Sequence, residues 1–139
     1  MDTKKKSSPG LIAIILVVAF GLPIAIGWME IRMARNAQAE TGAIDYLKAV
    51  AKTETDYRKA NDTFAEKLDD LKGLPKPDGT YKIGYKKVTS DSYLAMAWPT
   101  RPGKHGRRYF FMDQTGLVRY EVMHPAGPMS PEVPAGEKK

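Results

Sequence analysis

The sequence predicts an α+β protein in which one long N-terminal helix packs on a four-stranded antiparallel sheet. Between residues 40 and 61, apolar side chains recur at intervals of three and four residues, which is typical of an amphipathic helix. From residue 80 to residue 122, apolar and polar side chains alternate in short runs separated by turn-forming residues. Such runs predict strands, and their short connections favour antiparallel neighbours.

The N-terminal part of the helix is predicted to cross a membrane. Residues 7–29 carry no charged side chain, and a helix of that length measures about 34 Å, enough for a hydrocarbon core of about 30 Å. We therefore predict a basic N-terminus over residues 1–10 and a transmembrane helix over residues 11–29. The anchor residues of this predicted span are Leu11, Ile15, Phe20, Pro23 and Trp28.

The lysines before the apolar run predict its orientation. Because Lys4, Lys5 and Lys6 precede it, the positive-inside rule places the N-terminus in the cytoplasm and the following domain in the periplasm. The alternative is a secretory signal cleaved near Ala37-Gln-Ala39. Signal peptides have about 7–15 apolar residues with the cleavage site close behind, whereas the run here is longer. A retained single-pass anchor in the inner membrane is therefore the favoured prediction, with the lipid bilayer and other membrane-protein subunits as partners.

Beyond the span, the helix is predicted to continue to about Asn61. Its apolar stripe contains Ala43, Ile44, Leu47, Val50, Ala51 and Tyr57, and its opposite side carries Asp45, Lys48, Lys52, Asp56 and Lys59. Thr63 and Glu66 then have the spacing of a capping box, which predicts a second, short helical turn. This turn would bury Phe64, Leu68 and Leu71.

Four strands are predicted after this turn. They cover residues 80–88, 92–99, 108–113 and 117–122. Asp113–Gly116 is a tight-turn sequence whose glycine tolerates positive φ. The extracytoplasmic domain is predicted to cover residues 30–125, and the proline-rich residues 126–139 to form an extended tail.

The composition excludes several kinds of chemistry. The chain has no cysteine, so disulfides, thiolate metal sites and thiol catalysis are excluded. His105 and His124 lie far apart and have no partner at metal-ligand spacing. Phosphate-binding, dinucleotide-binding and zinc-protease motifs are also missing. We therefore predict no catalytic residue, no cofactor, no metal site and no small-molecule substrate.

One cluster of basic residues is a candidate partner-binding loop. It consists of Arg101, Lys104, His105, Arg107 and Arg108. The net charge of the chain is +6, but from Glu40 onward there are 17 lysines and arginines against 14 acidic residues. This weak excess does not favour a nucleic-acid partner. The loop is therefore either a site for an acidic partner or a solvated turn.

Three segments carry a resemblance to a known family. They are ARNAQAETGAIDYLKAVAKTETDYRKAN, TFAEKLDDLKGL and GRRYFFMDQTGLVRYE, which resemble the helix, the connecting segment and the closing hairpin of type IV pilins and pseudopilins. Family members that assemble carry a glutamate at the fifth position after the cleaved glycine. Here the fifth residue after Gly10 is Ile15.

The resemblance implies a pilin-like fold and a structural role. With the glutamate missing, it implies an accessory subunit of a larger membrane complex, such as a reaction centre or respiratory complex, and not a fibre subunit. The alternative is a minor pilin or pseudopilin of a type IV pilus or type II secretion machine.

Overall fold

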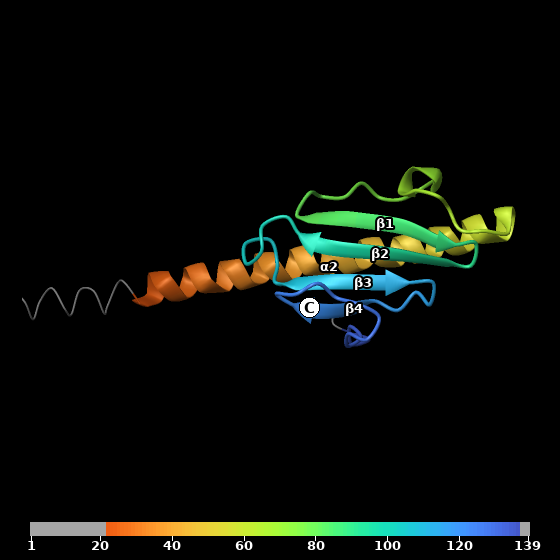
Figure 1. Cartoon of the computed structure of the whole chain (residues 1–139). Coiled ribbons are helices and arrows are strands. Elements are labelled where there is room, and N and C mark those ends of the chain that lie inside the picture. Colours follow the sequence, from red (N-terminus) through yellow and green to blue (C-terminus); the bar gives the residue numbers. More distant parts are fainter. Residues whose placement is uncertain (1–21, 137–139) are drawn as a thin grey trace, which may run out of the picture. The chain divides into compact units, whose positions relative to one another are not determined.

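The computed structural model describes the backbone of residues 22–136 and the side chains of residues 27–136. The chain divides into two compact units, residues 1–34 and residues 35–139. The long helix α2, Leu22–Asn61, belongs to both units, and the sheet lies entirely in the second one (Figure 1).

The predicted membrane span is not supported. Within the described residues, no helix combines the length and the apolar character needed to cross a bilayer. The predictions of a single-pass anchor, an inner-membrane location and a periplasmic domain are therefore wrong by this finding. The described helix contains Glu30, Arg32 and Arg35 shortly after Trp28, and these charges interrupt its apolar run. Pro23 and Trp28 lie in α2, whereas the predicted anchor residues Leu11, Ile15 and Phe20 lie outside the described residues.

The four-stranded antiparallel meander is confirmed. Its strands are β1 (Tyr81–Thr89), β2 (Ser92–Pro99), β3 (Arg108–Asp113) and β4 (Arg119–Val122), in the order β1-β2-β3-β4. Strand β4 begins two residues later than predicted. Val118 accepts a backbone hydrogen bond of 2.9 Å from Val133 instead of pairing with β3.

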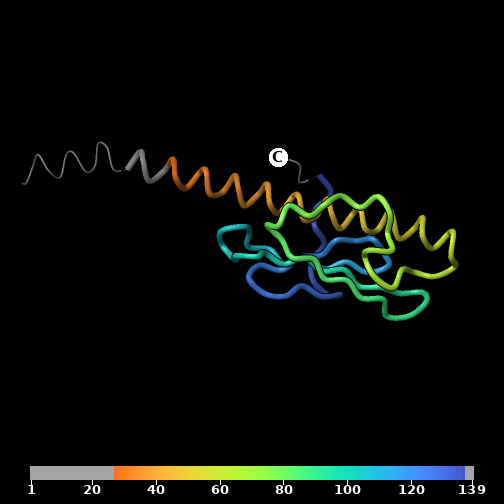
Figure 2. Tube along the Cα trace, turned by 90° about the horizontal axis from the view of Figure 1, so that it is seen from above, coloured from red at the N-terminus to blue at the C-terminus, as the bar shows by residue number. Residues whose placement is uncertain are grey.

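Residues 35–61 of α2 cover one face of the sheet (Figure 2). The helix contributes Leu47 and Val50, both fully buried, to a core that also contains Phe110 and Met112 of β3. On β2, Tyr93, Ala95 and Ala97 are buried on the face toward the helix, while Met96 and Trp98 occupy the outer face. The α+β architecture with a helix on one face of the sheet is therefore as predicted.

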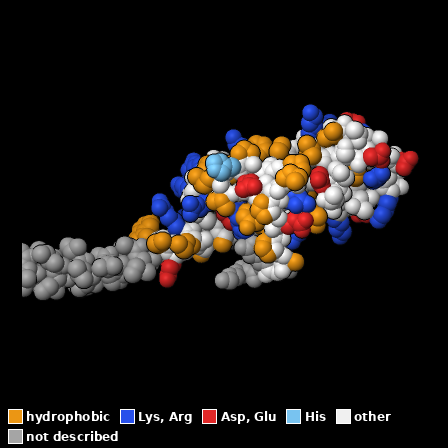
Figure 3. Space-filling model, turned by 60° about the horizontal axis from the view of Figure 1, so that its bottom comes forward, with side chains coloured by type: hydrophobic (Ala, Val, Ile, Leu, Met, Phe, Trp, Pro, Cys, Tyr) orange, Lys and Arg blue, Asp and Glu red, His pale blue; other side chains and the backbone are white. Residues whose placement is uncertain are grey.

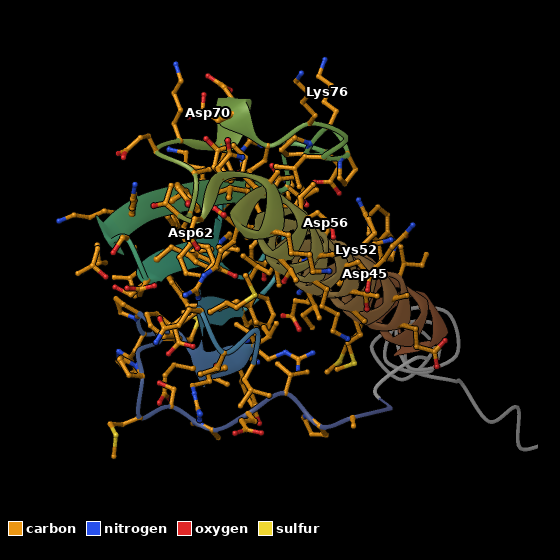
Figure 4. The ribbon with its side chains drawn as sticks, turned by 90° about the vertical axis from the view of Figure 1, so that its right-hand side faces the viewer. Asp45, Lys52, Asp56, Asp62, Asp70 and Lys76 are labelled. Carbon is orange, nitrogen blue, oxygen red and sulfur yellow. The ribbon has the colours of Figure 1, made fainter. Side chains whose placement is uncertain are left out.

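The polar side of α2 faces away from the sheet. Asp45, Lys52 and Asp56 lie along that side (Figure 4) and are exposed. This agrees with the predicted amphipathic arrangement.

The predicted capping box after α2 does not form. Residues 62–67 make a bend, and only the short 3-10 helix η2, Leu68–Asp70, follows. The Thr63 hydroxyl lies 3.4 Å from the carbonyl oxygen of Ser90, to which it donates a hydrogen bond, so it bonds to the β1–β2 turn instead of capping a helix. Phe64 and Leu71 are nevertheless buried.

The segment after β4 runs beside that strand. The Tyr120 backbone N–H donates a 2.9 Å hydrogen bond to the Pro131 carbonyl, and the backbones of Arg119 and Glu132 form an isolated antiparallel β-bridge. The Arg119 guanidinium also lies 3.2 Å from the Glu132 carboxylate. Val133 packs against the core, so this proline-rich segment is tied to the sheet.

Candidate partner-binding site

The predicted basic residues lie in and directly after the loop that joins β2 to β3, residues 100–107, hereafter the basic loop. Its backbone is closed on itself by hydrogen bonds from Gly103 to Gly106 (2.7 Å) and from both Lys104 and His105 to Arg101 (3.0 Å each). Gly103 and Gly106 have positive φ angles of 79° and 134°, which glycine adopts at no steric cost. The loop therefore has a defined conformation.

A buried glutamate of α2 holds one end of this loop. The Glu40 carboxylate accepts backbone hydrogen bonds from Arg107 (2.8 Å) and Arg108 (3.3 Å), and one from Nε of Arg108 (2.7 Å). The side chains of Glu40 and Arg108 are only 10% and 17% exposed. The carboxylate therefore accepts hydrogen bonds from two backbone N–H groups and one guanidinium. Each of these bonds is charge-assisted and therefore strong, so together they hold this end of the loop against the helix.

Tyr81 of β1 contacts the same end of the loop. Its hydroxyl donates a hydrogen bond to the Arg108 carbonyl (2.9 Å). Burial, followed by the nearby negative charge of Glu40, raises the pKa of Tyr81 well above its ordinary value of 10.0. A Cβ atom at Gly106 would overlap the Tyr81 hydroxyl and lie 3.1 Å from Cγ of Glu40, so only glycine fits at this position.

The middle of the loop contacts the helix at Asn36. Its Nδ2 donates a hydrogen bond to the Gly103 carbonyl (3.3 Å). Asn36 Oδ1 and His105 Nδ1 are buried atoms with no hydrogen-bond partner in the described part of the chain. Beside them is an open cavity of about 340 Å³ whose lining includes Arg35, Lys104 and Asp78.

The structure separates the predicted loop residues into two groups. Arg101, Lys104 and Arg107 are exposed, and within residues 27–136 none of them forms an ion pair. Arg108 instead turns toward Glu40 and lies 5.3 Å from the Tyr120 ring centroid. His105 is half-buried. Figure 3 shows lysine and arginine side chains near a histidine at one end of the second unit.

A second buried glutamate lies on α2. Glu54 is fully buried; Oε1 accepts a hydrogen bond from the Tyr85 hydroxyl and Oε2 one from the Ala65 backbone (3.2 Å). Burial and the hydrogen bond to Glu54 raise the pKa of Tyr85 well above 10.0. Burial, and then the charge of Glu54, also raise the pKa of Tyr93.

Sequence reasoning missed both glutamates, although a signal was present. Glu40 and Glu54 fall seven residues before and after Leu47, on the apolar stripe of the helix. A carboxylate at a stripe position needs partners inside the fold, because burying an unpaired charge is very costly. The spacing could have identified them.

No metal centre is formed in the part of the chain that the structure describes: no group of three or more histidine, aspartate or glutamate residues is placed to hold an ion. No family model matches the sequence, and no curated protein matches it either.

Proposed function

We propose that this protein is a non-catalytic accessory subunit of a larger protein assembly, in which its basic loop binds an acidic surface of a partner protein. Arg101, Lys104 and Arg107 make the contact. Arg108 does not, since it is committed to Glu40.

The observation that carries the proposal is the way in which Glu40 fixes the loop. Its carboxylate holds the backbone of Arg107 and Arg108, while the three exposed cations keep their charge unpaired among the described residues. A loop held in one conformation loses little entropy on binding. Exposed cations of one sign accelerate encounter with an acidic partner and help to select it. A merely solvated turn does not require a buried carboxylate to fix it.

A further observation supports membership of an assembly. In the first unit, α2 exposes four large apolar side chains: Trp28 at 67%, Met29 at 59%, Ile31 at 56% and Met33 at 57%. Large apolar side chains gathered in this way mark interaction surfaces. We propose that a helix of another subunit packs against them.

The non-catalytic role and the pilin-like relationship are parts of the same proposal. The first is supported by the absence of catalytic motifs and cysteine from the sequence. The second is supported by the order of the elements, a long helix followed by an antiparallel meander. The relationship accounts for a scaffold that presents loops to neighbouring subunits.

Site-specific photo-crosslinking in the source cells tests the proposal. A photoreactive amino acid at Arg107 should give an adduct of one fixed mass with a single partner. The same amino acid at Lys52, exposed on the side of α2 away from the sheet, should not give that adduct. Replacing Arg101, Lys104 and Arg107 together by alanine should weaken association at least tenfold, and added salt should weaken the native association.

The triple-alanine variant also supplies the contrary result. If it retains the partner at the same stoichiometry and the same salt dependence, the basic loop is not the binding site. An adduct from Lys52 equal to that from Arg107 leads to the same conclusion.

A further inference from the structure

We infer that an apolar groove on the outer face of the sheet binds a bulky apolar side chain of the same partner, next to the carboxylates that contact the basic loop. The inference rests on the proposed function and specifies the partner: a protein segment in which one aromatic or branched residue is flanked by aspartates or glutamates.

The groove lies where the ends of β2 and β3 meet the segment after β4. It has a volume of about 320 Å³, and its walls include Met96, Trp98, Tyr109, Pro125 and Ala126. Every residue that lines it is apolar or aromatic. With no charged side chain in its walls, such a groove favours an apolar group and provides no counter-charge for a phosphate.

A glycine on the outer face of the sheet makes room for one wall of this groove. Gly84 of β1 pairs with Met96 of β2, and a Cβ atom at Gly84 would lie 2.9 Å from the Trp98 ring. The missing side chain thus gives Trp98 room to lie against β1. Met96 remains 37% exposed on a face that α2 does not cover.

The strand ends that line the groove lead directly into the basic loop. Trp98 lies three residues before Arg101, and Tyr109 lies two residues after Arg107. The Met123 backbone donates a 2.9 Å hydrogen bond to the Arg107 carbonyl, so the segment that carries Pro125 is tied to the loop. A short extended peptide can therefore contact the groove and the loop together.

The charges around the groove determine which peptide fits. Lys82 is paired with Trp98 on the outer face, and Glu121 is paired with Tyr109. The loop adds Arg101, Lys104 and Arg107, with Asp78 beside Lys104, so these cations outnumber the carboxylates. A segment with carboxylates beside its apolar residue complements this arrangement, because opposite charges are favoured and like charges are penalised.

A peptide-display selection tests the inference. The full chain is immobilised and exposed to a random 12-residue phage library. The enriched peptides should share a bulky apolar residue flanked by aspartate or glutamate. A synthetic copy of the strongest binder should lose at least tenfold in affinity when its apolar residue is replaced by serine, and when its carboxylates are amidated.

Variants of the protein locate the binding site. Met96→Lys places a charge in the groove but keeps the positive potential, and should weaken binding of that peptide at least fivefold. Met129→Lys adds the same charge at a residue that is 96% exposed and does not line the groove, so it should change binding less than twofold. Ala126→Lys places a charge in the groove at a residue that is not part of a strand. It replaces Met96→Lys in this test if Met96→Lys fails to fold.

The outcomes separate this inference from the proposed function. If the loop triple-alanine variant loses the peptide while the groove variants bind it as Met129→Lys does, the groove inference is wrong and the basic loop stands. If neither kind of variant weakens binding, both are wrong. If no peptide is enriched, or the enriched peptides lack an apolar residue, the groove inference is also overturned.

Discussion

The two ends of α2 in the second unit bury a glutamate in two different ways. Glu40 meets a cation: Arg108 Nε lies 2.7 Å away, and the carboxylate also accepts hydrogen bonds from the backbone N–H groups of Arg107 and Arg108. Glu54 meets only the Tyr85 hydroxyl and the Ala65 N–H in the described structure. The same residue type, on the same face of the same helix, is therefore balanced by charge at one end and by neutral dipoles at the other.

The difference shows what each carboxylate contributes. Removing Glu40 takes away a carboxylate that contacts the largely buried Arg108 guanidinium, together with the acceptor that fixes the basic loop. Removing the charge of Glu54 leaves no unpaired ion, because its two partners, the Tyr85 hydroxyl and the Ala65 N–H, are neutral. We therefore expect the Glu40 end to be sensitive to charge and the Glu54 end to depend on shape and hydrogen bonding.

The largest effect is expected for Glu40→Ala. Removing one partner of a buried ion pair should lower the free energy of unfolding by about 3 kcal/mol, measured by urea unfolding at neutral pH. The matched control is Glu66→Ala, whose side chain is 75% exposed in its pair with Lys87 and should cost less than about 1 kcal/mol. Equal losses for the two variants would contradict the role assigned to Glu40.

Gly106→Ala tests the close packing of Gly106 against Tyr81 and Glu40. The added Cβ would overlap the Tyr81 hydroxyl at a φ of 134°, so a loss of about 2 kcal/mol in unfolding free energy is expected. Gly103→Ala, in the same loop at a φ of 79° and with nothing within 4 Å of the added atom, should cost about 1 kcal/mol. If the two variants are equally stable, the contact with Tyr81 is not limiting.

Much of the fold could be predicted from the sequence, because periodicity reports local structure directly. The bounds of β2 and β3 were predicted to the residue, and the end of α2 was predicted near Asn61, where the helix ends. Alternation alone does not say which side of a strand faces the helix. On β2 the small Ala95 is buried and the larger Met96 is exposed, so residue size alone does not identify the face that packs on the helix.

The candidate site was predicted only in part. The cluster of basic residues was visible as a run of charges, but the separation of Arg108 from Arg107 depends on Glu40, 68 residues earlier in the chain. A capping box was predicted at Thr63 because its spacing fits a helix start. The hydroxyl instead bonds to the Ser90 carbonyl, and a contact over such a separation cannot be derived from spacing.

Tyr93→Phe tests the Glu54 end through alkaline pH. The hydroxyl of Tyr93 makes no hydrogen bond to the described residues, so the change preserves packing. Because its native pKa is raised above 10.0, the unfolded chain releases this proton first as the pH rises past 10. Unfolding free energy should therefore fall above pH 10, and Tyr93→Phe should remove about 1 kcal/mol of the loss between pH 10 and pH 11.

The measurement is urea unfolding at pH 8, 10 and 11, together with the tyrosinate absorbance of the native protein. The variant and the native protein should differ little at pH 8. Parallel loss of stability in both proteins between pH 10 and pH 11 would show that Tyr93 ionises in the native state as readily as in the unfolded one.

Glu54→Gln should have a smaller effect. The amide retains an oxygen for one hydrogen bond and removes the cost of burying a charge, so the free energy of unfolding should change by less than about 1 kcal/mol. Glu40→Gln is the matched change at the other end and should cost clearly more, because it removes the negative charge from a largely buried contact with the Arg108 guanidinium. A greater loss for Glu54→Gln than for Glu40→Gln would reverse the comparison.

The smallest effect is expected where an ion pair is exposed. Arg58 and Asp91 lie 2.6 Å apart, but their side chains are 44% and 69% exposed, and water screens such pairs. Asp91→Asn should therefore lower the free energy of unfolding by less than about 0.5 kcal/mol, measured in 50 mM and 500 mM salt. Arg58 also lies 4.8 Å from the Phe64 ring centroid, and this contact remains in the variant. A loss near that of Glu40→Ala would mean that distance, and not burial, decides what an ion pair contributes in this fold.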